Sequence, residues 1–108
     1  MCKYTFLAQN ENGVIRYCQD CDTYNIMYNN LLMNFQKHGM ELFKMDLRQC
    51  YDYHTENYCV EHRDLRNVTI STGMDGLMFL FSTHEVGELL ALIQEAQMSM
   101  IMEAEPNQ

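Results

Sequence analysis

Basic side chains are scarce in this sequence. Seven lysines and arginines stand against fifteen aspartates and glutamates, which gives a formal net charge of -8, and no lysine or arginine follows Arg66. Such a surface repels phosphate groups. The basic stripe that is typical of nucleic-acid-binding domains is missing, so we do not expect direct binding of DNA or RNA.

Long apolar runs and loop-forming residues are also missing. No stretch of about 18 apolar residues is present, and the start "MCKYTFLAQNENG" lacks the apolar segment of a signal peptide. We therefore expect a cytoplasmic protein that does not associate with membranes. A single proline and five glycines argue against a long disordered segment. We predict one domain over residues 1–104 and a flexible tail over residues 105–108.

The sequence contains no recognisable catalytic constellation. No serine, cysteine or carboxylate has the sequence neighbour that a triad or dyad needs, and there is no glycine-rich phosphate loop. His38 and His84 occupy equivalent places at two predicted helix starts, which could indicate an acid–base pair. First-turn surface positions explain them better, so we favour a non-enzymatic protein.

The first half of the chain reads as strands followed by a helix. Residues 2–9 and 14–18 have strand character and flank "NENG", whose Asn12-Gly13 pair is expected to supply the positive φ of a tight hairpin turn. The next segment, "TYNIMYNNLLMNF", reads as extended structure broken in its middle. Apolar residues at helical spacing then predict a helix over residues 37–52.

The second half repeats this order. "NVTIST", a turn at "GMDG" and "LMFLF" precede a helix predicted over residues 83–103, whose start is marked by the capping-box pair Ser82 and Glu85. Sliding the halves by 46 positions aligns His38 with His84 (84 − 38 = 46). This predicts two ββα units after the N-terminal strand hairpin, with chance similarity as the alternative.

These elements predict an α+β fold. Each helix has one apolar stripe, so we expect a two-layer domain in which an antiparallel sheet carries both helices on one face. Between the units, residues 52–66 are polar and aperiodic and should form an exposed connection. The side chains predicted to be buried are Phe35, Phe43, Leu47, Ile70, Phe79, Phe81, Leu89, Leu90 and Ile93.

Three cysteines predict a metal site. An odd count of five, in a reducing compartment, favours free thiols or metal ligands over a disulfide framework. If the first hairpin closes through "NENG", Cys2 falls near Cys21, and the Cys-x-x-Cys turn points the sulfurs of Cys18 and Cys21 at one spot. The three thiolates would supply three of the four ligands of a tetrahedral structural zinc ion.

Other interpretations of the thiols stay open. They could be unliganded residues packed beside a turn, or a redox pair, which the negative charges of Asp20 and Asp22 disfavour. A second cluster could also hold a metal ion, but composition alone explains it better, and its members other than Cys50 are candidates for the fourth zinc ligand. It comprises Cys50, His54, Cys59 and His62.

The chain also resembles a known family. The stretches "CKYTFLAQNENGVIRYCQDC", "YNIMYNNLLMNF" and "NVTISTGMDGLMFLF" are similar to a family of small bacterial proteins classed as a domain of unknown function, over nearly the whole length. The resemblance implies Cys2, Cys18 and Cys21 as the family's thiols. Tyr4 stands where the family pattern has a histidine, and the resemblance implies no activity.

Two classes of function follow. The first is a non-enzymatic protein-interaction module with a structural zinc site. The alternative is a small thiol- or metal-dependent enzyme or redox sensor that uses the same cysteines. At 100° per residue, Met98 and Met102 turn away from the apolar stripe of the second helix, whereas Met100 and Ile101 stay on it. Flexible methionines off the core face predict a protein partner or a homodimer.

Overall fold

The computed structural model describes residues 2–57 and 63–104. The predictions for Cys59, His62 and the tail at 105–108 therefore lie outside the described residues. The elements follow in the order β1 (Tyr4–Gln9), β2 (Gly13–Cys18), β3 (Thr23–Tyr28), β4 (Leu31–Phe35), α1 (Lys37–Asn57), β5 (Arg66–Ser71), β6 (Met78–Ser82) and α2 (Thr83–Ala104). Every strand pair is antiparallel, and the predicted α+β fold is confirmed.

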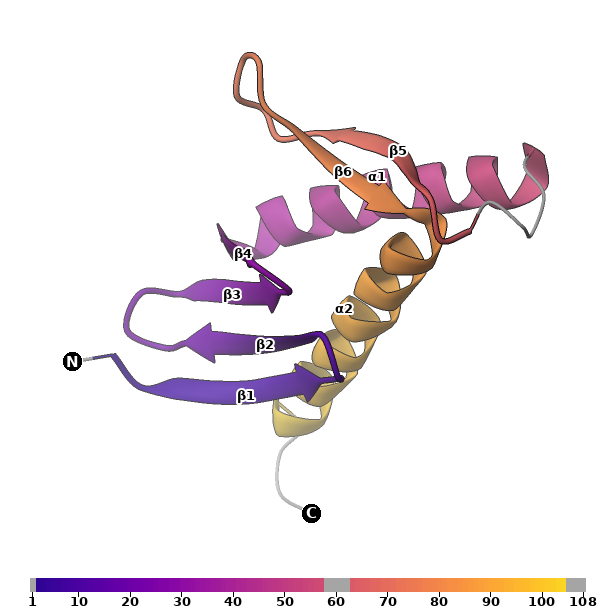
Figure 1. Cartoon of the computed structure of the whole chain (residues 1–108). Helices are drawn as coiled ribbons and strands as arrows, with labels where there is room; N and C mark the ends of the chain where they lie inside the picture. The colour runs from indigo at the N-terminus through magenta and orange to yellow at the C-terminus, as the bar shows by residue number, and fades with distance from the viewer. Residues whose placement is uncertain (1, 58–62, 105–108) are drawn as a thin grey trace. The chain divides into compact units, whose positions relative to one another are not determined.

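The strands are divided between two sheets. Strands β1 to β4 form one sheet in sequence order, and β5 pairs with β6 in a second sheet (Figure 1). After the β1–β2 hairpin, the predicted ββα order is present twice, as β3–β4–α1 and β5–β6–α2, and the two helices begin 46 positions apart (83 − 37 = 46). The backbone forms two compact units, Met1–Leu42 with Ala91–Gln108, and Phe43–Leu90.

In the first unit, one face of the four-stranded sheet packs against the C-terminal half of α2. Ile15 on β2 and Ile26 on β3 lie opposite each other and are fully buried. The Ser99 hydroxyl on α2 donates a hydrogen bond of 2.8 Å to the carbonyl oxygen of Leu7. Alternation along the strands leaves the opposite face for polar and exposed side chains.

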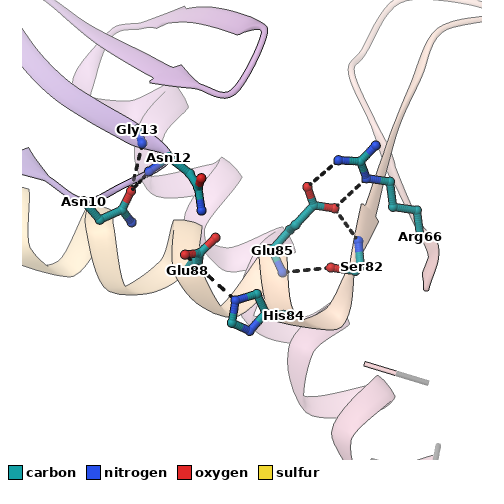
Figure 2. Close-up of polar contacts among 8 residues, drawn as sticks. All are labelled: Asn10, Asn12, Gly13, Arg66, Ser82, His84, Glu85 and Glu88. Carbon is teal, nitrogen blue, oxygen red and sulfur yellow. Dashed lines mark hydrogen bonds and ion pairs between the residues drawn. The ribbon is translucent and has the colours of Figure 1, made fainter. Parts of the chain in front are cut away.

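The turn between β1 and β2 differs from the prediction. Neither Asn12 nor Gly13 has a positive φ. Instead, the Asn10 side-chain oxygen accepts hydrogen bonds from the backbone N–H groups of Asn12 and Gly13, at 2.9 and 2.8 Å (Figure 2). Gly13 is required for close packing, because a Cβ atom there would lie 2.6 Å from the Met27 carbonyl oxygen and 3.3 Å from Leu92.

In the second unit, aromatic rings join α1 to the β5–β6 hairpin. The ring centroids of Phe43 and Phe79 are 5.7 Å apart, and Phe79 stacks on Phe81 at 5.5 Å. The predicted turn at "GMDG" is present, with positive φ at Gly73 and Gly76. The hairpin therefore presents its apolar face to the helix.

The start of α2 is capped as predicted. The backbone N–H of Glu85 donates to Ser82 Oγ at 3.1 Å, and the backbone N–H of Ser82 donates to Glu85 Oε1 at 2.9 Å (Figure 2). Arg66, at the start of β5, donates to both oxygens of the same carboxylate at 3.0 Å. The cap thus ties the first turn of α2 to the adjacent strand.

Helix α1 is longer than predicted. It ends at Asn57, so the first part of the expected loop is helical. The polar residues there are compatible with a helix because Tyr51 packs against α2, where a Cβ at Gly87 would lie 2.9 Å from the Tyr51 ring. The Thr55 hydroxyl also donates to the Tyr51 carbonyl oxygen, one helical turn back.

Most of the predicted core is buried. Phe35 and Phe79 are only half-buried, because one ends an edge strand and the other belongs to a sheet of two strands. Ile101 stays on the apolar stripe of α2 but is 56% exposed. It borders a pocket of about 420 Å³. The apolar stripe continues along the helix there, but the described side chains leave this part of it more than half exposed.

Candidate metal centre

The pairing of β1 with β2 carries Cys2 to the turn that follows β2. Tyr4 lies opposite Cys18 in the ladder, with a bulge between Phe6 and Ala8. Beyond the ladder, the Gln19 N–H donates to the Lys3 carbonyl oxygen at 3.3 Å. The residues before β1 therefore run beside the Cys-x-x-Cys turn.

The three predicted thiols converge. The sulfur atoms of Cys2 and Cys21 are 3.4 Å apart, and the sulfurs of Cys2, Cys18 and Cys21 all lie within 4.8 Å of one another. A tetrahedral ion with Zn–S bonds of about 2.3 Å separates its sulfurs by about 3.8 Å. Cys18 is buried, whereas Cys2 and Cys21 lie at the surface. These three sulfurs are close enough together to hold one metal ion.

Hydrogen bonds in the turn make Cys18 the preferred thiolate. Burial opposes its ionisation, but the backbone N–H groups of Cys21 and Asp20 and the neighbouring thiols donate to its sulfur, so the pKa of Cys18 is lowered. Hydrogen bonds to Cys2 and Cys18, together with their negative charge, raise the pKa of the Cys21 thiol to about 12. A bound cation would favour the thiolate form of all three.

The carboxylates of Asp20 and Asp22, in the same turn as the sulfurs, accept hydrogen bonds from other groups. The Lys3 backbone N–H donates to Asp20 Oδ2 at 3.0 Å. The Tyr17 hydroxyl donates to Asp22 Oδ1 at 2.6 Å, and this bond is the main reason that the pKa of Tyr17 is raised to about 12. Asp22 itself adopts a positive φ, which turns the chain into β3.

Tyr4 is held by Arg16. The Arg16 guanidinium carbon lies 3.7 Å from the centroid of the Tyr4 ring, a cation–π contact. Arg16 Nε donates to the Asn25 side-chain oxygen at 2.9 Å, and the Asn25 amide donates to Asn34 Oδ1 at 2.6 Å. Sequence reasoning missed this polar row across β2, β3 and β4. The sequence did contain a signal for it: Arg16, Asn25 and Asn34 are polar residues that lie directly opposite one another on neighbouring strands.

The other candidate residues do not add to this set. Cys50 and His54 belong to α1, and the group of described ligand atoms within 4.8 Å comprises the three sulfurs alone. His38 and His84 are both exposed in the first turns of their helices, as predicted. His84 lies 3.9 Å from the Glu88 carboxylate, an exposed i,i+4 contact (Figure 2).

Comparison with known proteins identifies the family. The chain belongs to the family of unknown function DUF6686, whose model matches residues 1–105. A comparison with curated proteins and another with solved structures found no match. Neither of the helices in the described part of the chain is long and apolar enough to cross a membrane. Family membership confirms the resemblance seen in the sequence and assigns no reaction.

Proposed function

We propose that Cys2, Cys18 and Cys21 bind one zinc ion, which fastens the start of β1 to the turn after β2 in a small cytoplasmic protein-interaction module. The convergence of three sulfurs within 4.8 Å carries this proposal. Thiolate sulfur suits Zn²⁺ and Cu⁺ better than Mg²⁺ or Ca²⁺. Zinc is the candidate that has a structural role without redox chemistry.

The metal would contribute to folding. In the described part of the chain, the Lys3 backbone is joined to the turn by hydrogen bonds with Gln19 and Asp20. An ion bound to Cys2 and to the Cys-x-x-Cys pair links the two segments directly. At 100 times its dissociation constant, free zinc would stabilise the fold by about 2.7 kcal/mol.

The test is elemental analysis of the full-length protein purified without chelator. We expect about one zinc per chain in the wild type and none in a variant with Cys2, Cys18 and Cys21 all changed to serine. Cys50→Ser is the matched control, because Cys50 lies on α1 and outside the three-sulfur group. A metal-free wild type that also fails to take up added Zn²⁺ would contradict the proposal.

The interaction role draws on exposed apolar side chains. Met98 on α2 is 59% exposed, and Phe6 and Leu32 at the two edge strands of the four-stranded sheet are 68% and 60% exposed. Flexible methionine surfaces adapt to partners. Met102 belongs to the same proposed surface, although its side chain lies outside the described part of the chain. A second copy of the protein is the partner that we propose for this helix end.

A redox sensor is the second candidate function, because the 3.4 Å separation of Cys2 and Cys21 favours a disulfide between them. In that reaction, two S–H bonds break and one S–S bond forms, and a peroxide takes up the two electrons and two protons to give water. Mass mapping of metal-free protein treated with hydrogen peroxide tests it. A Cys2–Cys21 disulfide that dithiothreitol reverses is expected, and its absence would contradict this function.

A further inference from the structure

Among the described residues, the group of potential metal ligands consists of three sulfurs, and the side chains of Asp20, Asp22 and Tyr4 have contacts of their own. Asp20 accepts the Lys3 N–H, and Asp22 accepts the Tyr17 hydroxyl. The Tyr4 ring lies under the Arg16 guanidinium. A tetrahedral ion needs a fourth donor. The described residues thus group three sulfurs without a fourth ligand atom, which leaves one position of a tetrahedral ion to be filled.

The accessibility of the site fits a donor from outside. Cys2 and Cys21 are exposed, and only Cys18 is buried. The sulfurs thus form a shallow site at the end of the β1–β2 hairpin, with its buried member beneath. A donor group of another molecule can approach from the solvent side without displacing a core residue.

The net charge of the metal centre favours one chemical class for the fourth ligand. Three thiolates and Zn²⁺ carry a net charge of -1, and Asp20 and Asp22 belong to the same turn. A fourth thiolate would add a further negative charge, whereas a neutral imidazole adds none. Imidazole nitrogen is also a common zinc ligand, with Zn–N of about 2.0–2.1 Å.

We propose that the metal bound by Cys2, Cys18 and Cys21 keeps an exchangeable fourth position, and that this position takes a neutral imidazole ligand from another molecule. This inference rests on the proposed metal site. It makes the zinc centre a contact point for a histidine of a partner, because a closed four-ligand site could not accept one. Free imidazole is the probe for this chemistry, and a histidine-containing peptide is the probe for a protein source.

A substitution at residue 4 allows an imidazole within the chain to be compared with one supplied by another molecule. Tyr4 pairs with Cys18 across the β1–β2 ladder, so the two side chains point to the same face of the sheet. A Tyr4→His substitution places an imidazole beside the sulfurs within the chain itself. Tyr4→Phe is the matched control, because it keeps a ring under Arg16 and adds no ligand.

The experiment is a titration of the Co²⁺-loaded full-length protein, followed by its visible absorption. We expect imidazole, and the histidine peptide at lower concentration, to change the wild-type and Tyr4→Phe spectra saturably. Tyr4→His should start with a spectrum close to that of the imidazole complex and should not respond. Zinc affinity should rise at least about 10-fold in Tyr4→His, because the change adds a ligand and even the loss of an outer-shell partner alters metal affinity about 10- to 100-fold.

Three other outcomes would overturn the inference, and they differ from failure of the metal site itself. A tetrahedral Co²⁺ spectrum that imidazole leaves unchanged means that the chain supplies its own fourth ligand, which the variants His54→Ala, Cys59→Ser and His62→Ala would identify. A response to 2-mercaptoethanol but not to imidazole means that the external donor is a thiolate. A response to free imidazole but not to the peptide excludes a protein source. If the wild type binds no Co²⁺ or Zn²⁺ at all, the proposed function fails as well.

Discussion

The Cys2 sulfur lies 3.4 Å from the Cys21 sulfur, although the two residues are 19 positions apart in the chain. The β1–β2 hairpin, which lies between the two residues in the chain, brings them together. Its antiparallel ladder brings the residues before β1 beside the turn after β2, where Cys18 already lies. Changes to Cys2 should therefore reveal whether the three sulfurs act together.

Cys2→Ser should weaken zinc binding by more than about 100-fold, since it removes a ligand rather than an outer-shell partner. Competition with a chromophoric zinc chelator at constant pH measures this affinity. Cys50→Ser should leave it unchanged, because Cys50 is not part of the three-sulfur group. Equal losses in both variants would show that the effect is not specific to the site.

Glu85 should make stability depend on pH. Partial burial opposes its charge, but the Arg66 guanidinium and the hydrogen bonds with Ser82 outweigh burial and lower the pKa of Glu85. A lowered pKa contributes stability above the unfolded-state value, near 4.5, and that contribution disappears as the pH falls through the folded-state value.

Glu85→Gln removes the charge beside Arg66, whereas a glutamine can still accept the Ser82 N–H of the capping box, so the substitution should lower the free energy of unfolding by about 0.5–1 kcal/mol at pH 7. The difference from the wild type should shrink below pH 4. Urea unfolding across the pH range measures both effects. Glu95→Gln, an exposed change on the same helix, is the control and should show neither. A deficit for Glu85→Gln that stays constant down to low pH would contradict the assignment.

Gly13→Ala should destabilise the protein by about 1–3 kcal/mol, because the added methyl group would lie 2.6 Å from the Met27 carbonyl oxygen and force the backbone to shift. Thermal unfolding gives the change. Glu11→Ala, in the same turn and exposed, should stay within about 0.5 kcal/mol of the wild type. If Gly13→Ala is as stable as the wild type, the close packing of the hairpin is not maintained in solution.

Met98→Glu should weaken self-association by more than about tenfold if a second copy covers the end of α2. Burial of a methionine side chain contributes about 1.5–3 kcal/mol, and each 1.4 kcal/mol is tenfold in the dissociation constant. Sedimentation equilibrium measures the association. Gln94→Glu adds the same charge at another exposed site one turn earlier and should have a smaller effect. A wild type that stays monomeric at high concentration would remove this surface from the proposed function.

Local features of the chain could be predicted from the sequence by itself. Both helix starts, the capping box at Ser82 and Glu85, and the glycine turn at Gly73 and Gly76 depend on residues within a few positions of one another. The sulfur cluster could also be predicted, although Cys2 and Cys21 are 19 positions apart, because a hairpin with a short turn determines which residues beyond its ends can meet.

Other features were decided only by the tertiary structure. The division of the strands into two sheets depends on pairing between segments, which a strand pattern does not specify. Gly13 is needed for contact with Met27 and Leu92, not for a positive φ, and only the folded chain brings those residues near it. The end of α1 at Asn57 lies beyond the predicted helix, and there the Thr55 hydroxyl donates to the Tyr51 carbonyl oxygen. Ile101 remains exposed although it continues the apolar stripe of α2. Helical periodicity determines where a side chain points, but burial depends on whether another part of the chain is present to cover it.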